Sequence, residues 1–258
     1  MSHAVVTSLT AAFESDERPA AERERLVRLM ALFADLPPPP DVSDHFPRYA
    51  ELQREFRDSC RSNDPEQIEE RFLELYAHLH MYEAPYTPEE RRRVDETGGY
   101  WSHAGGLSPI LKAGDWLRPD SVSADLGAGN GLQGLLFQKL YPHRRTIQVE
   151  ISSTMVEIGM RLQRWLDIPD DRVEWVVGDV MSASVKGTDF LYLYRPVRPD
   201  GPGRAFYERI AAELDGSDSD VVIFSIADCL RDFLSPRFEV FYSDGHLTCF
   251  KKTPSPDS

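Results

Sequence analysis

Three absences limit what this chain can be: long apolar runs, paired cysteines and an excess of basic residues. No segment of its 258 residues approaches the roughly 18 apolar residues that a membrane-spanning helix requires. Lys and Arg number 29 against 43 Asp and Glu, so the formal net charge is −14. Because phosphate backbones attract cationic surfaces, this charge argues against nucleic-acid binding. We therefore predict a protein without a membrane segment and without a nucleic-acid partner.

Cysteine is rare, and its spacing is unlike that of a metal site. Cys60, Cys229 and Cys249 lie far apart, and no CxxC pair occurs. An odd, widely spaced set fits reduced, buried thiols better than disulfides or metal ligands. The stretch up to Glu22 is mixed and acidic, without the basic and apolar blocks of a secretory signal. The sequence thus predicts a cytoplasmic protein with no bound metal.

The N-terminal part of the chain has helical patterns separated by proline. Leu26, Leu29 and Phe33 recur at helical spacing, and a run of four prolines ends that helix. Asp64 and Thr87 each precede a proline and acidic residues, as helix N-caps do. Helices are expected at 21–36, 46–60, 65–83, from 88 onward and at 107–117.

From residue 121 the pattern changes to alternating strands and helices. Strands are expected at 121–126, 146–151, 173–177, 189–194, 221–226, 238–243 and 246–251, with helices at 132–141, 153–166, 203–214 and 228–234. This order implies right-handed crossovers and a mostly parallel sheet covered on both faces. Asp244-Gly245 separates the last two strands and predicts an antiparallel hairpin between them.

The change of pattern divides the chain into four segments. We predict a flexible tail at 1–20, a helical N-terminal cap at 21–97 that contributes to substrate selection, a cofactor-binding α/β domain at 98–252 and a second tail at 253–258. A glycine-rich aromatic loop at 98–106 opens the third segment. Such a loop is typical either of a lid over a ligand site or of a tightly packed corner, and we favour the lid.

The most informative stretch runs from Ser121 to Gly131, a short apolar strand followed by three glycines at alternate positions. Without a Cβ, Gly127, Gly129 and Gly131 can adopt positive φ and let a ligand approach the backbone closely. The helix that follows offers N–H groups at its first turn. Strand, glycine turn and helix N-terminus together predict a site for a nucleotide-containing cofactor.

Polar side chains also follow the neighbouring strands, at the carboxyl edge where an open parallel sheet binds its ligand. Asp125 lies near the end of the first strand. Glu150 ends the second, 19 residues beyond Gly131, where a carboxylate can accept both hydroxyls of a ribose. Asp179 follows the third strand, and Tyr194 ends the fourth. The sequence therefore predicts that these side chains meet around one cofactor.

These motifs, in this order, resemble those of the class I S-adenosylmethionine-dependent methyltransferases. The resemblance covers about residues 99–252 and lies in Asp125-Leu-Gly-Ala-Gly-Asn-Gly131, Glu150 with Ile151 and Met155, Gly178-Asp179-Val180 and the closing hairpin. It implies an α/β fold with a seven-stranded, mostly parallel sheet of order 3-2-1-4-5-7-6, helices on both faces and a helical N-terminal cap. The cofactor that it implies is S-adenosylmethionine.

The resemblance also implies a role for each matching residue. The implied cofactor contacts are Tyr100 closing over the cofactor, Asp125, Gly127, Ala128 and Gly129 at the methionine end, Glu150 at the ribose, Ile151 and Met155 beside the adenine, Asp179 and Val180 at the adenine amino edge, and Tyr194 near the transferred methyl group.

Methyl transfer requires little covalent chemistry of the protein, because the sulfonium already activates the methyl group. The protein must align the acceptor in line with the carbon–sulfur bond and exclude water. The candidate catalytic residues are Tyr194, which can wall the transfer site, and His103, which can act as a base. Arg195 and Arg198 can bind an acidic group of the acceptor or pair with acids of the chain. The expected acceptor is a small molecule or a protein side chain.

Two other functions stay open on the sequence. Gly129-Asn-Gly131-Leu-Gln-Gly134 satisfies the GxGxxG spacing of NAD(P)-dependent oxidoreductases, although Asp125 and the closing hairpin disfavour that class. The fourth strand ends in Tyr194-Arg195-Pro196 instead of the Asn/Asp-Pro-Pro-Tyr/Phe motif of amino-group methyltransferases. This departure also allows a catalytically silent domain that binds S-adenosylmethionine, or its product S-adenosylhomocysteine, as a regulatory module. Structural roles stay open for Asp179, as a turn cap, and for Met155, as a core residue.

Overall fold

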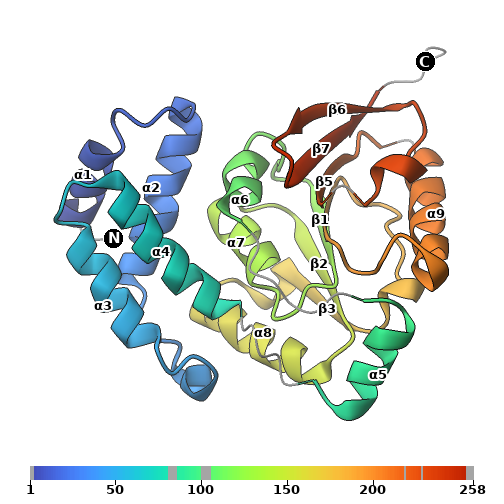
Figure 1. The fold of residues 1–258 in the computed structure, drawn as a ribbon, viewed down its shortest axis with the longest axis horizontal. Coiled ribbons are helices and arrows are strands. Elements are labelled where there is room, and N and C mark those ends of the chain that lie inside the picture. Colours follow the sequence, from blue (N-terminus) through green and yellow to red (C-terminus); the bar gives the residue numbers. More distant parts are fainter. Residues whose placement is uncertain (1–2, 81–85, 100–105, 218, 228, 254–258) are drawn as a thin grey trace. The chain divides into compact units, whose positions relative to one another are not determined.

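The computed structural model describes residues 3–80, 86–99, 106–217, 219–227 and 229–253, which fold into two compact units (Figure 1). The first unit comprises Met1–Glu83 and His103–Gly114, and the second comprises Ala84–Ser102 and Asp115–Ser258. The boundary therefore differs from the predicted one near residue 97. The helix that begins at Pro88 belongs to the sheet-containing unit, whereas the helix that begins at Leu107 belongs to the helical unit.

The helical unit is built from five α-helices and one 3₁₀ helix within the described residues. They are α1 (His3–Ala12), α2 (Ala20–Asp35), η1 (Pro40–His45), α3 (Tyr49–Ser59), α4 (Pro65–Leu79) and α6 (Leu107–Ala113). Its centre is aromatic, since the Phe72 ring lies 5.7 Å from that of Phe33 and 5.3 Å from that of Phe56. Asp64 caps α4 as predicted, because its carboxylate accepts from the N–H groups of Glu66 and Gln67.

The prediction of a flexible tail at residues 1–20 is wrong for α1. Leu9 and Phe13 are almost wholly buried, with 0% and 1% of their surface exposed, and α1 packs against α2. The helix contains several β-branched and hydroxyl residues, which are poor intrinsic helix formers. Its stability therefore comes from burying these two apolar side chains, which lie four residues apart and so share one face.

The second unit contains a seven-stranded sheet of order β3-β2-β1-β4-β5-β7-β6, as predicted. Its strands are β1 (Val122–Leu126), β2 (Arg145–Glu150), β3 (Val173–Val177), β4 (Phe190–Tyr194), β5 (Val222–Ile226), β6 (Phe238–Ser243) and β7 (Leu247–Lys252). The first five strands are mutually parallel, and β7 runs antiparallel to both β5 and β6. The all-buried β1 and β5 consist mainly of apolar or small residues, as strands covered on both faces do.

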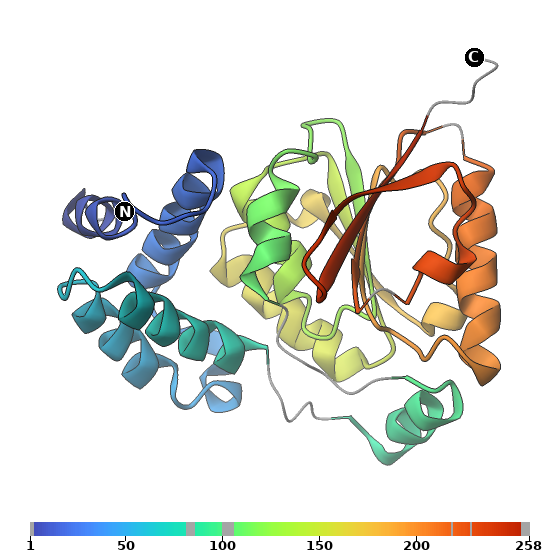
Figure 2. The same ribbon diagram turned by 45° about the horizontal axis from the view of Figure 1, so that its top comes forward.

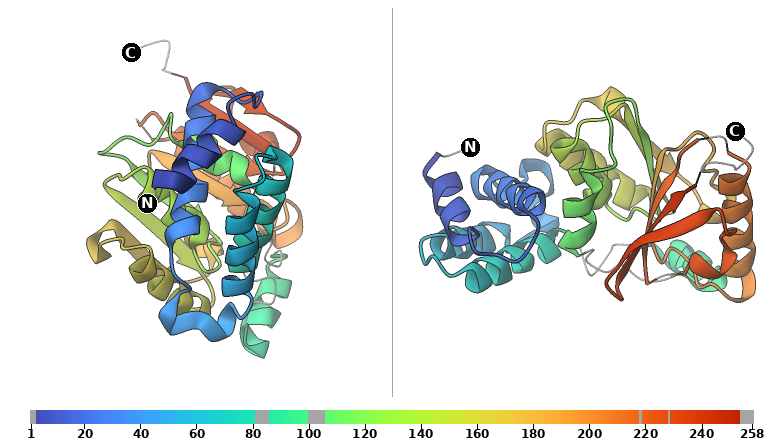
Figure 3. Two further views of the ribbon diagram at one scale, coloured as in Figure 1. Left: turned by 90° about the vertical axis from the view of Figure 1, so that its left-hand side faces the viewer. Right: turned by 90° about the horizontal axis from the view of Figure 1, so that it is seen from above.

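Helices cover both faces of this sheet, as Figures 2 and 3 show. One face carries α7 (Leu132–Leu140) and α8 (Ser153–Trp165), and the Phe137 ring of α7 lies 5.4 Å from Phe190 and 5.6 Å from Tyr192. The opposite face carries α9 (Gly201–Asp215), whose Phe206, Ile210 and Leu214 join the core formed by alternate residues of β1, β4 and β5. The remaining helix, α5 (Pro88–Glu96), begins with the predicted Thr87 cap.

The closing hairpin has the predicted antiparallel pairing, with a wider turn than two residues. Ser243 pairs with Thr248, and the Asp244 carboxylate accepts from the backbone N–H groups of His246 and Leu247. The α-helix predicted at 228–234 is wrong: the described part of that stretch holds a single 3₁₀ turn, η4 (Arg231–Phe233). Its apolar residues suited a helix, but Leu230 is instead buried in the core below a short loop.

No helix among the described segments combines the length and the apolar character needed to cross a membrane.

Candidate functional site

The carboxyl edge of the parallel strands brings together most of the predicted site residues. Strands β1, β2, β3 and β4 are neighbours in the sheet and run in the same direction, so their ends lie along one edge. The glycine turn follows β1, Glu150 ends β2, Asp179 follows β3 and Tyr194 ends β4. This edge is where open α/β sheets bind ligands.

The glycine turn after β1 exposes backbone to solvent, as its composition predicts. Gly127, Gly129 and Gly131 all have positive φ, at 79°, 59° and 69°. The N–H groups of Gly127 and Ala128 both donate to the carbonyl of Val149, at 2.9 Å each, which ties the turn to β2. Gly127 is exposed, and a Cβ at Gly129 would meet only the Met155 methyl group, at 3.8 Å. The turn therefore leaves room for a ligand against its backbone.

Glu150 is a buried carboxylate held against the glycine turn. Only 3% of its surface is exposed. One carboxylate oxygen accepts from the N–H of Gly129 at 2.8 Å, and the other accepts from the N–H of Ser152 at 3.0 Å. Burial raises its pKa above the usual range. Glu150 is thus preorganised beside the turn rather than solvated at a strand end.

Asp125 is a second buried carboxylate at the same edge, also 3% exposed. Burial, together with the charge of Glu150, raises its pKa to about 7, although the N–H of Gly134 donates to it from the first turn of α7. Two acids are therefore held close together away from water. Such an arrangement favours a ligand that carries positive charge or hydrogen-bond donors.

The predicted adenine contacts are less accessible than the resemblance implies. Met155 is fully buried and Val180 is 9% exposed, whereas Ile151 is half-buried. One Asp179 oxygen accepts from the N–H of Met181 at 2.9 Å, so this residue caps η3 (Val180–Ser182). Its other oxygen lies 3.9 Å from an Arg93 nitrogen. The turn-cap role of Asp179 and the core role of Met155 are therefore both present in this structure.

Tyr194 has an aromatic neighbour that the sequence did not reveal. Its ring lies edge-on to that of His246, with centroids 6.2 Å apart. Because β7 runs antiparallel to β5, the loop that precedes β7 lies at the carboxyl edge of β5, and the His246 carbonyl accepts from the N–H of Ala227 there at 2.7 Å. The Asp244-Gly245 motif predicted the hairpin, but the position of His246 beside Tyr194 depends on the pairing of β7 with β5.

The other two predicted residues, Tyr100 and His103, lie outside the described residues.

Two of the described non-glycine residues with positive φ lie at this edge. Arg195 follows β4 with φ of 46°, and Ala227 follows β5 with φ of 58°. Neither is glycine, so each conformation costs roughly 1–3 kcal/mol that the surrounding structure must offset. Residues held in this way cluster at ligand and catalytic sites.

Tyr86 is a further residue at the site that the motifs did not predict. Its hydroxyl donates to Glu150 at 3.4 Å, across 64 positions of sequence. Burial, followed by the charge of Glu150, raises the pKa of this phenol well above its usual value, so the hydroxyl keeps its proton. No local spacing signals this contact, because its two residues are brought together only by the tertiary fold.

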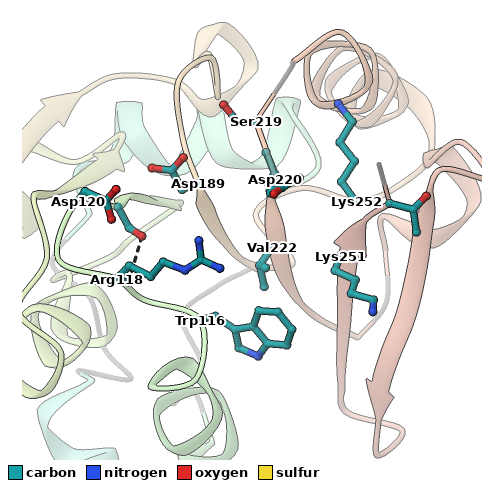
Figure 4. A pocket seen from close by; sticks show the side chains of 12 residues that line it. Trp116, Arg118, Asp120, Asp189, Ser219, Asp220, Val222, Lys251 and Lys252 are labelled. Carbon is teal, nitrogen blue, oxygen red and sulfur yellow. Dashed lines mark hydrogen bonds between the residues drawn. The ribbon is translucent and has the colours of Figure 1, made fainter. Parts of the chain in front are cut away.

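A separate pocket of about 460 Å³ lies at the opposite, amino edge of the sheet (Figure 4). It is lined by Trp116, Arg118, Asp120, Ser121, Asp189, Ser219, Asp220, Val221, Val222, Lys251, Lys252 and Thr253. Its acidic and basic residues are mixed, and Lys252 turns its Nζ to the carbonyls of Leu214 and Asp215. None of the predicted site residues lines it.

The chain is similar to known proteins in its fold only. No family model and no curated protein matches the chain. Among solved structures, the YcgJ protein from Bacillus subtilis is 19% identical with a TM-score of 0.39, and the match covers 46% of this chain and 49% of that one. The chain thus matches about half the length of that protein.

Two further structures illustrate the range of proteins with a similar architecture. An RNA methyltransferase from Salinibacter ruber in complex with S-adenosyl-L-homocysteine is 18% identical with a TM-score of 0.44, over 59% of this chain and 94% of that one. A geranyl diphosphate C-methyltransferase from Streptomyces coelicolor is 16% identical with a TM-score of 0.39, over 46% and 42%. At this level of similarity the matches carry no argument about activity.

The fold assignment rests on the sheet itself. Five parallel strands in the order β3-β2-β1-β4-β5, closed by the antiparallel β7 and β6, form the seven-stranded Rossmann-like fold of the class I S-adenosylmethionine-dependent methyltransferases.

Proposed function

We propose that this protein is an S-adenosylmethionine-dependent methyltransferase whose cofactor site is the carboxyl edge of β1, β2, β3 and β4. The observation that carries the proposal is the buried Glu150 carboxylate, hydrogen-bonded to Gly129 within a glycine turn whose backbone is exposed. A carboxylate at the end of β2 suits the two hydroxyls of a ribose. The glycine turn after β1 suits the methionine part of the cofactor, which would lie directly against the backbone of the turn.

The residues present fit this cofactor at its methionine and ribose ends. Asp125 and Glu150 together concentrate negative charge next to Gly127 and Gly129, which suits the cationic sulfonium and ammonium groups of the methionine part. The adenine end is less well matched, because Met155 is fully buried and Asp179 caps η3. We therefore assign the strongest cofactor contacts to Asp125, the 127–129 turn and Glu150, with Ile151, Met155, Asp179 and Val180 as flanking residues.

The bound cofactor would supply an activated methyl group, so the protein's own task is to position the acceptor and exclude water. Tyr194 ends β4 at the edge of the site, and its ring packs against His246. We propose these two side chains as the wall of the acceptor site, with His246 able to take a proton from an acceptor that carries one. Tyr100 and His103 stay predictions, because they lie outside the described residues.

The acceptor class is proposed as a small molecule or a protein side chain, consistent with the net charge of −14. An RNA acceptor would instead require a cationic surface to hold phosphates. Mass spectrometry after incubation of the protein with isotopically labelled methyl donor and separate small-molecule, protein and RNA fractions of a cell extract tests this. Label that appears in the RNA fraction alone would contradict the proposed acceptor class.

We expect S-adenosylmethionine to bind in the micromolar range and NAD not to bind. The expected difference follows from the acids at Asp125 and Glu150, which attract the cationic methionine end and disfavour the pyrophosphate of a dinucleotide. Isothermal titration calorimetry of both ligands measures it. Binding of NAD in preference to S-adenosylmethionine would assign the site to the oxidoreductase class instead.

Replacing Glu150 with alanine should weaken S-adenosylmethionine binding about tenfold to a hundredfold. The change removes hydrogen bonds to a charged acceptor, which are each worth roughly 1.5–3 kcal/mol. Glu174→Ala is a matched control, because Glu174 also lies on a strand of the sheet but pairs at the surface with Arg145, 2.9 Å away. Circular dichroism checks that both variants fold. Equal affinity in the Glu150 variant and the wild type would show that Glu150 does not contact the ribose.

The mass spectrometry with labelled methyl donor also distinguishes a methyltransferase from a catalytically silent binding module. A silent binding module would bind S-adenosylmethionine and S-adenosylhomocysteine with affinity comparable to an enzyme, yet would transfer no label to any fraction. The absence of the Asn/Asp-Pro-Pro-Tyr/Phe motif at Tyr194-Arg195-Pro196 is the feature that keeps this alternative in view.

A further inference from the structure

The Glu150 carboxylate is surrounded by hydrogen-bond donors. It accepts from the N–H of Gly129 and of Ser152, from the Tyr86 hydroxyl at 3.4 Å, and from the N–H of Ile151. An ionised carboxylate has about four acceptor positions on its two oxygens. In the described part of the chain, four donors thus face about four positions. A further donor can therefore form a full hydrogen bond to the Glu150 carboxylate only when one of these four donors leaves.

The four donors differ in their freedom to leave. Three are backbone N–H groups of the glycine turn and of the start of α8, and moving them would disrupt the turn that connects β1 to α7 or the cap of α8. Tyr86 is the one side-chain donor among them, and its bond is longer than those from Gly129 and Ser152. A side chain can move while the backbone stays in position, so displacement of the Tyr86 hydroxyl would disturb the turn and the α8 cap least.

We propose that Tyr86 is an internal competitor for the nucleoside subsite, whose hydroxyl occupies Glu150 until the ribose diol displaces it. This inference rests on the proposed function, because it takes Glu150 as the ribose ligand. The ligand chemistry is that of a nucleoside with a free 2′,3′-diol. Such a ligand brings two adjacent hydroxyl donors, one of which takes the position on the carboxylate that the phenol hydroxyl leaves.

Tyr86 belongs to a segment that runs along the carboxyl edge of the sheet, here called the strap and comprising residues 86–99. At its start, the Tyr86 carbonyl accepts from the Arg91 side chain at 3.2 Å, and α5 follows directly. At its end, Gly99 pairs with Val197 in an antiparallel bridge, and the Gly98 carbonyl accepts from the N–H of Arg198 at 2.8 Å.

The strap therefore reaches the ends of three of the four strands that form this edge, β2, β3 and β4. It meets β2 at Glu150, lies near Asp179 after β3 through Arg93, 3.9 Å away, and meets the stretch after β4 at Val197. The contact at Val197 uses backbone hydrogen bonds, whereas the contact at Glu150 uses one long side-chain bond. Displacement of the Tyr86 hydroxyl from Glu150 would therefore leave the backbone anchor of the strap at Val197 in place.

The test is the affinity for S-adenosylhomocysteine of the wild type, of Tyr86→Phe and of Tyr242→Phe, measured by calorimetry on the full chain. Tyr86→Phe should bind about threefold to tenfold more tightly, because the loss of one ordinary hydrogen bond to Glu150 removes the competition. Tyr242→Phe is the matched control. It also removes a phenol–carboxylate bond, to Asp244 at 3.0 Å, in the closing hairpin, and it should leave the affinity unchanged.

The possible outcomes distinguish failure of the proposed Tyr86 role from failure of the proposed function. If the wild type binds S-adenosylhomocysteine and Tyr86→Phe binds equally or more weakly, Tyr86 is not a competitor, and the proposed function stands without it. If both tyrosine variants gain affinity equally, the effect is not specific to Glu150, and the inference is likewise overturned. If neither the wild type nor Tyr86→Phe binds, the proposed function fails and the inference fails with it. Thermal melts confirm that each variant is folded.

Discussion

Replacing Gly131 with alanine is expected to lower the free energy of unfolding by roughly 2–5 kcal/mol. Gly131 precedes α7 with φ of 69°, where a side chain costs roughly 1–2 kcal/mol. A Cβ there would also lie 2.8 Å from Cζ3 of Trp175, closer still to its Cη2, and 2.9 Å from Nε2 of Gln148. Overpacking of this kind typically adds roughly 1–3 kcal/mol.

The indole of Trp175 cannot easily yield. Its Nε1 donates to Gln163 Oε1 at 2.8 Å, and its far edge also lies against Gly159 of α8, where a Cβ would again meet Cζ3 at 2.8 Å. Two glycines on different elements therefore leave room for one ring. This explains why the third glycine of the turn is needed for packing, whereas a Cβ at Gly129 would meet only the Met155 methyl group, at 3.8 Å.

Urea unfolding of Gly131→Ala and Gly187→Ala separates strain from overpacking. Gly187 has φ of 76°, and a Cβ there would have no atom within 4 Å, so its replacement should cost only the conformational part, roughly 1–2 kcal/mol. In a Trp175→Leu background, the cost of Gly131→Ala should fall toward that same value. Equal losses for the two glycines in the wild-type background would contradict the packing explanation.

Much of the sheet could be predicted because its signals are local. Period, apolar runs and the Asp244-Gly245 motif are properties of short segments, and they located all seven strands to within a residue or so at each end. Those patterns alone do not determine the order of the strands in the sheet. The predicted order followed from the resemblance of the motifs between Asp125 and Val180, and the structure confirms it.

The errors arose where burial overrides local preference. The segment of α1 has poor intrinsic helix formers, yet it is helical because Leu9 and Phe13 pack into the helical unit. Conversely, the stretch around Leu230 has a helix-like composition, but its leucine reaches the core from a loop. The division of α5 and α6 between the two units likewise depends on tertiary contacts that no local pattern reports.

Some residues of the candidate site could likewise be predicted from the sequence, and others could not. The positions of Asp125, Glu150 and Asp179 at one edge follow from the parallel direction of their strands, so they could be predicted. Tyr86 and His246 could not, because each reaches the edge through a partner more than 50 positions away in sequence. The sequence also did not predict that both Asp125 and Glu150 are buried, and this burial raises the pKa of each carboxyl group.

Replacing Asp125 with asparagine is expected to stabilise the protein at pH 8 by about 2–4 kcal/mol. Burial and the charge of Glu150 raise the pKa of Asp125 from its usual value of 3.8 to about 7. The folded state therefore holds this proton more tightly than the unfolded state, and the stability it confers is full below about pH 4 and lost as the pH rises through about 7. A difference of one in the pKa between the two states corresponds to roughly 1.4 kcal/mol, and asparagine stays neutral throughout.

Urea unfolding at pH 4 and pH 8 measures this difference. Asp125→Asn should match the wild type near pH 4 and exceed it at pH 8, because asparagine can still accept from the N–H of Gly134 without a charge to bury. The exposed Asp120→Asn is the control and should change stability little at either pH. A wild-type stability that rises from pH 4 to pH 8, with no gain in Asp125→Asn, would contradict the electrostatic explanation.

The same substitution should weaken S-adenosylmethionine binding about tenfold to a hundredfold, because the proposed cationic methionine end loses a charged acceptor worth roughly 1.5–3 kcal/mol. Stability and binding are thus expected to change in opposite directions at one residue. In the wild type, a cation beside Asp125 offsets its repulsion from Glu150, so the affinity should increase between pH 6 and pH 8 as Asp125 ionises. In Asp125→Asn this pH dependence should disappear. Calorimetry at pH 6 and pH 8 thus distinguishes loss of the carboxylate charge from distortion of the binding site.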